Sequence, residues 1–574
     1  MANIAQYPCL NFSGGVRRDK SSLEMDRTEL LDARGVEIDE RGRIKIRRGS
    51  FQVGQTLANT IENSFVWERV VGGSTPVASI YQNDSAGNVY ILLSSRLTTA
   101  LTTASTTVVI SGNATNYAAT GTIEINGDLI AYTGNNGSDT FTGVTGVVTS
   151  HPAGASVNQW IALTGESAFD TRGVSYTVVG NILIFGGGNL DYINNDNGTS
   201  VSNVGSEPTV LNLVTYRDRA YGSGNGSAGT NGDPRRVSFS NRGDGTTWTT
   251  ASDYFDVNDT TGSGVTALKV LNDRLLIFKT NSTFTYDEVE LKQRLTGVGA
   301  WNHKTPVEID GIMYTFCPRG IFQTNGSSAK DIGEPVRQYW ENFQPQVDAT
   351  AERVVTNTFS ARFKHYYLVY IGNVTDPNTT NDVVLCYNTK NNSWSVWPGY
   401  TNIRHFLGVD KYRFGDRPLQ FRPALFMGNT AGQYFRCFET RYVDRQSTPV
   451  NQGVDVFTDL VSNTALSGGT PVSAMIETPL YDMGQPSLFK KPKRLRVYAE
   501  RGVWSFEYRV EDEKEITQYK PLGVVTKTNQ SFDLPKDCAG YRVGLRVSAV
   551  NTSSQSILNG FIFEDIEVNQ RANK

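Results

Sequence analysis

Residues Val270–Asp287, VLNDRLLIFKTNSTFTYD, contain the pattern from which the fold of this chain can be read. In it, the polar pair Asn272-Asp273 is followed by the apolar run Leu275–Phe278, a second polar turn, and an aromatic run around Phe284. Short apolar runs between turn residues are typical of β-strands joined as hairpins. The pattern therefore predicts consecutive antiparallel strands rather than a helix.

This unit of turn, apolar strand, turn and aromatic strand recurs along the chain. Copies lie at 178–193 and 308–326, and looser ones lie at 363–397 and 424–438. Their spacing, about 40 to 60 residues, is typical of four-stranded propeller blades. We therefore predict an all-β protein with a β-propeller-like core over 61–96 and 159–445.

Two turns favour blades over a sandwich for this core. YNTKNNSW, from Tyr387 to Trp394, resembles the kelch pattern, in which a polar turn places an aromatic pair between neighbouring blades. SNRGDGTTW, from Ser240 to Trp248, imperfectly resembles the Asp-box turn of sialidase-type propellers. A sialidase would need several such boxes and a cluster of arginines near the axis, so one imperfect box does not indicate that activity.

Two further regions differ from the core in composition. Residues 97–158 are rich in Thr, Ala, Gly and Ser and almost free of charge, which predicts a small inserted β module. We expect Ile123, Ile125, Leu129 and Tyr132 in its core. Residues 446–574 contain apolar residues that alternate strictly with polar ones, which predicts half-buried antiparallel strands and hence a C-terminal β-sandwich platform.

The N-terminal segment, residues 1–60, combines a helix signal with a switch in charge. Ser21-Ser22-Leu23-Glu24 has the spacing of a capping box, so a short helix is expected there. Downstream, an acidic group gives way to a basic strand. We predict both groups, with a second basic cluster, as contacts between subunits of a ring. The predicted contacts are Glu37, Asp39, Glu40, Arg41, Arg43, Lys45, Arg47, Arg48, Lys490, Lys491, Lys493 and Arg494. The alternative is that the basic residues are solvated strand edges that resist pairing.

Composition restricts the classes of function. The 574-residue chain is long enough for several domains, and its 38% of hydrophobic residues predicts a sizeable core. With 54 basic and 57 acidic residues the formal net charge is -3, whereas proteins that grip DNA phosphates usually have a basic excess. We therefore expect no tightly held DNA, although DNA that passes by is compatible with this charge.

Targeting and redox features predict a protein made in a cytoplasm. The N-terminus has no charged region followed by an apolar run, and no stretch approaches the ~18 apolar residues of a membrane-spanning helix. The five cysteines lie far apart without a CxxC pair. We expect them to be reduced and buried.

No catalytic or cofactor motif stands out, so we expect neither catalytic residues nor a cofactor or metal. The chain has no GxxxxGK[ST] loop, no HExxH and no GxSxG. The four histidines are scattered, which favours structural or surface roles. The Asp/Asn-rich run at 191–197 offers oxygen atoms to calcium, but the usual bidentate Glu is missing.

Several segments together resemble a known family. NFSGGVRRDK (11–20), GVEIDERGRIKIRRGSFQVG (35–54) and SLFKKPKRLRVYAE (487–500) are similar to the start and the C-terminal sandwich of tail-nozzle proteins of short-tailed bacteriophages. These proteins are also called packaged-DNA stabilisation or tail tubular B proteins. The stretches 233–258 and 264–287 resemble their propeller core.

This resemblance implies a virion tail protein made in the bacterial cytoplasm. The implied assembly is a homo-oligomeric, six-fold ring below a tail adaptor, in contact with tail fibres or tailspikes. Genomic double-stranded DNA would pass through its channel without sequence-specific binding, and the host cell envelope is a further partner at the distal end. A slightly acidic wall suits sliding because duplex DNA carries one charge per ~1.7 Å.

Two alternatives remain open from the sequence. A receptor- or glycan-binding tail adhesin would use its aromatic residues, 11% of the chain, to stack on sugars. A glycoside-cleaving propeller would need paired carboxylates that sequence alone does not identify.

Overall fold

A computed structural model of the chain describes most of residues 2–569. The residues left out are 23, 48, 71–75, 166–173, 195–199, 206, 225–232, 261, 344–346, 349–352, 355–357, 373–381, 399, 401, 414–420, 438–471, 501, 513–514 and 551–555. Nearly all described elements are strands, so the predicted all-β class is confirmed.

Seven four-stranded antiparallel units are arranged in chain order, except that the last one takes its fourth strand from the N-terminal segment. The first three are β8 (Ile61–Val70), β9 (Pro76–Asp84), β10 (Val89–Arg96), β16 (Ser156–Ala162); β17 (Ser175–Val179), β18 (Ile182–Gly187), β19 (Asn189–Asn194), β20 (Val201–Asn203); and β21 (Val210–Tyr216), β22 (Arg219–Gly224), β23 (Arg236–Phe239), β24 (Tyr254–Asp256).

The other four units complete the series. They are β25 (Ala267–Leu271), β26 (Arg274–Phe278), β27 (Ser282–Tyr286), β28 (Leu291–Thr296); β29 (Val307–Ile309), β30 (Ile312–Cys317), β31 (Gly320–Thr324), β32 (Ala329–Asp331); β35 (Thr358–Phe363), β36 (Tyr366–Ile371), β37 (Val383–Asn388), β38 (Ser393–Pro398); and β39 (Ile403–Arg413), β40 (Phe421–Asn429), β41 (Tyr434–Cys437), β7 (Ser50–Gln52). Between the fifth and sixth units, β33 (Val347–Asp348) pairs with β34 (Arg353–Val354).

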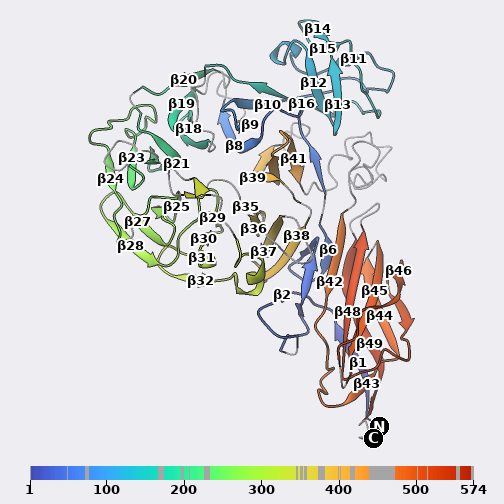
Figure 1. Ribbon diagram of the computed structural model, residues 1–574. Coiled ribbons are helices and arrows are strands. Elements are labelled where there is room, and N and C mark those ends of the chain that lie inside the picture. Colours follow the sequence, from blue (N-terminus) through green and yellow to red (C-terminus); the bar gives the residue numbers. More distant parts are fainter. Residues whose placement is uncertain are drawn as a thin grey trace.

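The seven units are blades of a propeller. Figure 1 shows them in a ring, with the labelled first strands β8, β21, β25, β29, β35 and β39 nearest the centre. Around this centre β8 contacts β17, β17 contacts β21, β21 contacts β25, β29 contacts β35, β35 contacts β39, and β39 contacts β8. The predicted propeller-like core is therefore confirmed.

Local turn chemistry explains why residues 270–287 form hairpins. Asn272 and Asp273 join β25 to β26 with φ angles of 49° and 54°. Two successive positive φ values match the right-handed twist of the strands, and Asn and Asp tolerate them better than most residues. The following blade repeats this device with Asp310, at φ 52°, and Gly311, at φ 81°.

Strand β7, from the N-terminal segment of residues 1–60, closes the ring. It is the fourth strand of the last blade and pairs antiparallel with β41, with Ser50 opposite Cys437 and Gln52 opposite Phe435. Val53 continues the pairing by donating its N–H to the Tyr434 carbonyl at 2.8 Å. The two ends of the propeller are therefore held together by residues far apart in the sequence.

The inserted module lies between two strands of the first blade. It contains β11 (Thr107–Val109), the 3-10 helix η1 (Ala114–Asn116), β12 (Gly121–Ile125), β13 (Asp128–Tyr132), β14 (Gly134–Asn135) and β15 (Thr140–Thr142). The predicted core positions Ile123, Ile125 and Tyr132 are buried, but Leu129 is 41% exposed. The prediction for Leu129 is wrong because β13 alternates and turns Ile130, not Leu129, inward.

The C-terminal region is a β-sandwich, as predicted. One sheet contains β47 (Gln530–Asp533), β44 (Arg494–Glu500), β49 (Ile557–Asn569), β6 (Ile44–Ile46), β5 (Val36–Ile38), β1 (Ala2–Cys9) and β43 (Phe489–Lys491). The other contains β42 (Ser473–Glu477), β48 (Arg542–Val550), β45 (Val503–Glu511) and β46 (Lys520–Val525). Alternating residues of β44, β45 and β48 are buried, which matches the period of two in the sequence.

A continuous sheet joins the propeller to the sandwich. Strand β4 (Asp32–Arg34) pairs with β38 of the sixth blade on one side and with β42 of the sandwich on the other. Figure 1 shows the sandwich beside this blade, with both chain termini at its far end. Residues 1–60 therefore contribute strands to both bodies instead of forming a separate unit.

The predicted N-terminal helix is wrong. The described residues of 21–31 contain two turns and then β3 (Glu29–Leu30). The Glu24 N–H and the Ser21 carbonyl close the first turn at 2.9 Å, and the Glu29 N–H and the Asp26 carbonyl close the second at 3.0 Å. Strand β3 pairs in parallel with β2 (Gly15–Val16), which buries Leu30 completely. A short isolated helix is marginal in water, so the burial of Leu30 decides the conformation. The described helical structure consists of the 3-10 helices η1 and η2 (Glu334–Tyr339), and neither is long and apolar enough to cross a membrane.

Candidate functional site

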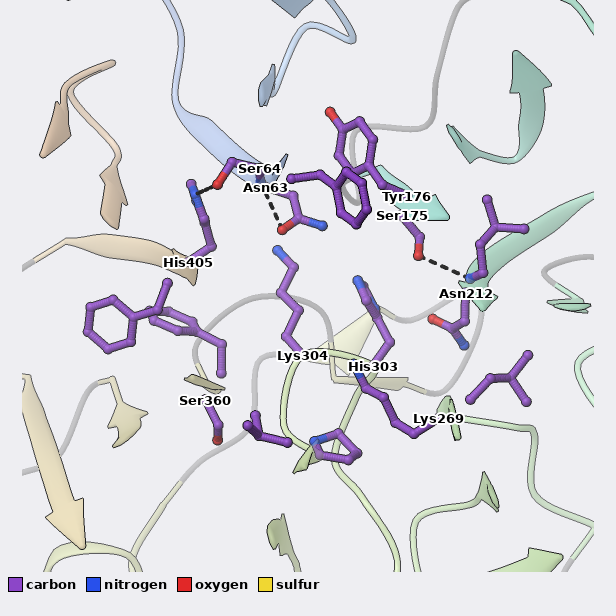
Figure 2. A pocket seen from close by; sticks show the side chains of 17 residues that line it. Asn63, Ser64, Ser175, Tyr176, Asn212, Lys269, His303, Lys304, Ser360 and His405 are labelled. Atoms are coloured by element: carbon purple, nitrogen blue, oxygen red, sulfur yellow. Dashed lines mark hydrogen bonds between the residues drawn. The ribbon is translucent and has the colours of Figure 1, made fainter. Parts of the chain in front are cut away.

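A cavity of about 220 Å³ lies on the axis of the propeller. The first strand of every blade contributes to its wall, and the segment before β29 adds His303 and Lys304. We call it the axial cavity; Figure 2 shows the side chains that line it. It exists only because the ring is closed, since no single blade provides more than a small part of the wall.

One side of the axial cavity is fixed by a chain of buried hydroxyl groups and a histidine. Ser64 on β8 lies 2.7 Å from Nε2 of His405 on β39, and the Tyr434 hydroxyl is 2.9 Å from Ser64 Oγ. All three side chains are buried. Burial holds the pKa of His405 well below its usual value, so the ring remains neutral. These hydrogen bonds connect the first blade to the last one where the propeller closes.

Cross-blade hydrogen bonds hold the opposite side. Ser175 Oγ on β17 accepts the N–H of Leu213 on β21 at 3.0 Å. Asn212, the residue before Leu213, donates from Nδ2 to the Thr266 carbonyl of the next blade at 3.3 Å and to Ser223 Oγ within its own blade at 2.5 Å. These bonds fix the polar groups in position before any ligand arrives.

Two lysines give the axial cavity its charge. Lys304 extends toward Asn63 in Figure 2, and its Nζ donates to the Glu62 carbonyl at 2.6 Å. Lys269 comes from β25. Desolvation within the cavity wall lowers the pKa of each lysine to about 8, so both are still mostly protonated at pH 7. No sequence motif indicates this site; the one local signal is Lys269 itself, a charge inside the apolar run TALKVL.

Three of the predicted contacts of the N-terminal segment, Asp39, Arg43 and Lys45, pair with one another. Asp39 Oδ2 lies 2.8 Å from Arg43 Nε and 2.9 Å from Lys45 Nζ. Although burial opposes the effect, hydrogen bonds from Arg43 and Lys45 hold the pKa of Asp39 below its usual value. Glu37 lies opposite Lys45 in the strand register. Glu40 and Arg41 are exposed, and Arg48 lies outside the described residues.

Arg47 bonds to other residues of the same chain. Its guanidinium donates to the Tyr400 hydroxyl at 2.9 Å and to the Pro398 carbonyl at 3.2 Å. It also lies 4.5 Å from the centre of the Tyr400 ring. Arg47 therefore attaches the N-terminal segment to the sixth blade of the same chain.

The second predicted cluster divides into buried and exposed residues. Lys490 is 0% exposed, and its Nζ donates to the Tyr541 carbonyl at 2.7 Å, so its prediction as a subunit contact is wrong. The backbone pairing of β43 with β49 turns this side chain inward. Lys491 is half-buried. Lys493 pairs with Glu567 at 2.6 Å and Arg494 lies 3.6 Å from Asp533, and both basic residues remain about half exposed, at 53% and 45%.

Cysteines and histidines form no metal cluster in the part of the chain that the structure describes. All five cysteines are buried and free, as predicted. Asp191, from the Asp/Asn-rich run, is buried on β19 and accepts a hydrogen bond from Asn203 at 3.2 Å. Residues 195–197 of that run lie outside the described residues.

Comparisons with known proteins give little beyond the fold. No protein-family model and no curated protein matches the chain. Among solved structures, the Phage phi92 endosialidase is 14% identical, over 54% of this chain and 53% of that one, with a TM-score of 0.23. The extracellular domain of the one-component system BT4673 from B. thetaiotaomicron is 9% identical, over 67% of this chain and 52% of that one, with a TM-score of 0.24.

The chain thus spans about half the length of the two solved structures it matches. Both TM-scores lie below 0.5, so the assignment of a propeller with a sandwich depends on the strand pairing itself.

Proposed function

We propose that this chain is a structural tail protein of a short-tailed bacteriophage, without catalytic activity. Identical subunits would form the nozzle ring that retains packaged DNA and conducts it during ejection. The proposal is supported by the resemblance of residues 11–20, 35–54 and 487–500 to nozzle proteins. It puts the protein in the virion tail, after synthesis in the bacterial cytoplasm, next to an adaptor and to tail fibres or tailspikes.

The observation that carries the proposal is the path of residues 1–60. They supply β1, β5 and β6 to the sandwich, β4 to the sheet that joins the two bodies, and β7 to the last blade. A subunit that bears the pressure of packaged DNA needs bodies that do not hinge against each other, and shared sheets resist hinging because their backbone hydrogen bonds would have to break. The segment with the nozzle-like sequence is the one that provides this rigidity.

Charge supports the same proposal. The formal net charge of -3 gives a subunit that does not hold duplex DNA by its phosphates, so DNA would slide past it. Glu40 and Arg41 are exposed, and Lys493 and Arg494 remain about half exposed beside Glu567 and Asp533, so neighbouring subunits could reach these charges. Contacts between opposite charges at subunit edges fix orientation more than affinity.

Electron microscopy of the purified full-length chain tests the proposal. We expect closed rings of six subunits with an axial hole, and density of the same shape in virion tails. Particles of a single subunit at micromolar concentration, together with absence of the protein from purified virions, would contradict it.

A second function, a receptor- or glycan-binding tail adhesin, is supported by the axial cavity. Its lining residues converge from all seven blades and include several polar side chains, which is typical of a ligand site. Host lipopolysaccharide should then bind to the propeller at a saturable site. Absence of saturable binding to the purified protein would exclude the adhesin.

A further inference from the structure

The wall of the axial cavity is cationic. Among its 17 residues are two lysines and two histidines, and none of these lining residues is Asp or Glu. A desolvated positive charge without an anionic partner is costly. Such an arrangement is typical of a functional site whose charge is balanced by a ligand.

Lys269 is the clearest case. Among the described residues no hydrogen bond or ion pair involves its Nζ, and the lowering of its pKa is caused by desolvation without a contribution from any carboxylate. The other charged or titratable side chains of the cavity wall are Lys304, His303, His405 and Tyr176. None of these supplies a negative charge near neutral pH.

The ammonium group of Lys304 has hydrogen-bond donors that its contact with Glu62 does not use. One N–H is used by the Glu62 carbonyl, which leaves two of the three ammonium hydrogens for a ligand. The Glu62 carboxylate raises its pKa and Arg404 lowers it, so the nearest charges outside the cavity oppose each other.

An acceptor for a ligand hydroxyl group completes the site. Oδ1 of Asn212 is buried and has no hydrogen-bond partner among the described residues, although Nδ2 of the same amide has two. An unpaired buried carbonyl oxygen is unfavourable, and a ligand hydroxyl would satisfy it. The site thus offers ammonium groups for an anion and an acceptor for a hydroxyl group.

We infer that the axial cavity binds a small hydroxylated oxyanion, with Lys269 and Lys304 at its acidic group and Asn212 at a hydroxyl. The cavity volume of about 220 Å³ suits a molecule of monosaccharide size. The acidic group can be a carboxylate, as in a sugar acid, or a phosphate ester, and both present oxygen atoms that ammonium groups bind. The inference goes beyond ring formation and does not depend on it.

Isothermal titration calorimetry at pH 7 tests this inference with three matched probes. Glucuronate carries a carboxylate, glucose 6-phosphate carries a phosphate ester, and glucose carries neither. We expect saturable binding of at least one acidic probe and none of glucose. The stronger of the two acidic probes identifies whether the site is built for a carboxylate or a phosphate.

Two variants connect the binding to the cavity. Lys269→Met keeps the aliphatic chain and removes the charge, and should weaken binding of the acidic probe about tenfold to a hundredfold. Lys292→Met, on the exposed outer strand of the same blade, should leave it unchanged. The melting temperature of Lys269→Met should equal or exceed that of the wild type, because the substitution removes an uncompensated, desolvated charge, and this separates lost binding from lost folding.

Three results would overturn the inference. They are no saturable heat from either acidic probe at about 10 mM, equal affinity for glucose, or equal affinity of Lys269→Met and the wild type. None of these binding measurements depends on whether the chain forms rings. A negative binding result therefore does not contradict the nozzle proposal, which electron microscopy tests separately.

Discussion

At the scale of single residues, burial changes what a charge does. Lys490 and Arg47 belong to basic clusters in the sequence, yet each is hydrogen-bonded to other residues of the same chain. A charged residue on a strand faces either solvent or core, and the strand register decides between them. The effect of these internal bonds on the free energy of unfolding can be measured by substituting the two residues.

The stability of the sandwich should depend on pH through Lys490. Burial lowers its pKa to about 8 in the folded protein, whereas an unfolded lysine has a pKa of about 10.4. Between these two pKa values the unfolded chain binds more protons than the folded chain. The contribution of Lys490 to the free energy of unfolding therefore rises as pH increases from 8 to 10. The nearby carboxylates of Asp482 and Glu511 raise the pKa of Lys490, and Arg542 lowers it.

Urea unfolding of the wild type and of Lys490→Met checks this. Relative to the variant, the wild type should gain about 2 kcal/mol between pH 7 and pH 10. Lys491→Met, at the next position, serves as the control. Parallel stability curves for the wild type and Lys490→Met would show that Lys490 is not desolvated.

Arg47→Met should lower the free energy of unfolding by about 2 kcal/mol, because it removes the contacts to Tyr400 and the Pro398 carbonyl. Arg41→Met, at an exposed position of the same segment, should change it by less than about 0.5 kcal/mol. Urea denaturation measures both. Equal effects of the two substitutions would mean that Arg47 is not bonded within the subunit.

At the scale of elements, closure of the ring by β7 depends on a close approach. Gly54 follows this strand at φ 74°, and a Cβ there would lie 2.6 Å from the Trp160 ring. Trp160 in turn donates from Nε1 to the Val53 carbonyl at 3.1 Å. The closing strand is thus fixed by an indole from the first blade.

Gly54→Ala should therefore be more destabilising than the same change at Gly137. Gly137 has φ 75°, but a Cβ added there would meet no atom within 4 Å, so both substitutions share the backbone strain and only the first adds a clash. We expect Gly54→Ala to cost about 1–3 kcal/mol more in thermal or urea unfolding. Equal costs would show that the contact with Trp160 relaxes freely.

At the scale of the whole molecule, the sheet through β4 couples propeller and sandwich. Ala33, in the middle of β4, is fully buried and lies opposite Ile476 of the sandwich. Because β4 also pairs with β38, neither body can unfold without exposing part of the other. The two bodies should therefore behave as one cooperative unit.

Scanning calorimetry tests this coupling. The wild type should show one main unfolding transition, and Ala33→Pro, which removes a backbone donor from β4, should separate it into two. Lys330→Pro, on the exposed edge strand β32, should weaken one blade and keep a single transition. Two well-separated transitions in the wild type would contradict the coupling.

The strands, their turns and the kind of blade they build are encoded locally and can be predicted from the amino-acid order. In residues 270–287, each strand is bounded by its own turn residues, and its neighbour in the sheet is its neighbour in the chain. The kelch-like turn also places its aromatic pair as predicted. The ring centres of Trp394 and Tyr387 lie 4.8 Å apart, and Trp394 Nε1 donates to the Ile332 carbonyl of the preceding blade. Such short-range pairing can be predicted because the interacting residues lie close in sequence.

The role of residues 1–60 and the position of the axial cavity, in contrast, emerge from long-range pairing in the folded chain. Ser50 pairs with Cys437, and Ser64 meets His405, across hundreds of residues. No local pattern encodes these partners, since many short strands have similar apolar faces and a free edge accepts any of them. The closed ring selects one set of pairings because it buries every blade, and the cavity with its two lysines follows from that closure.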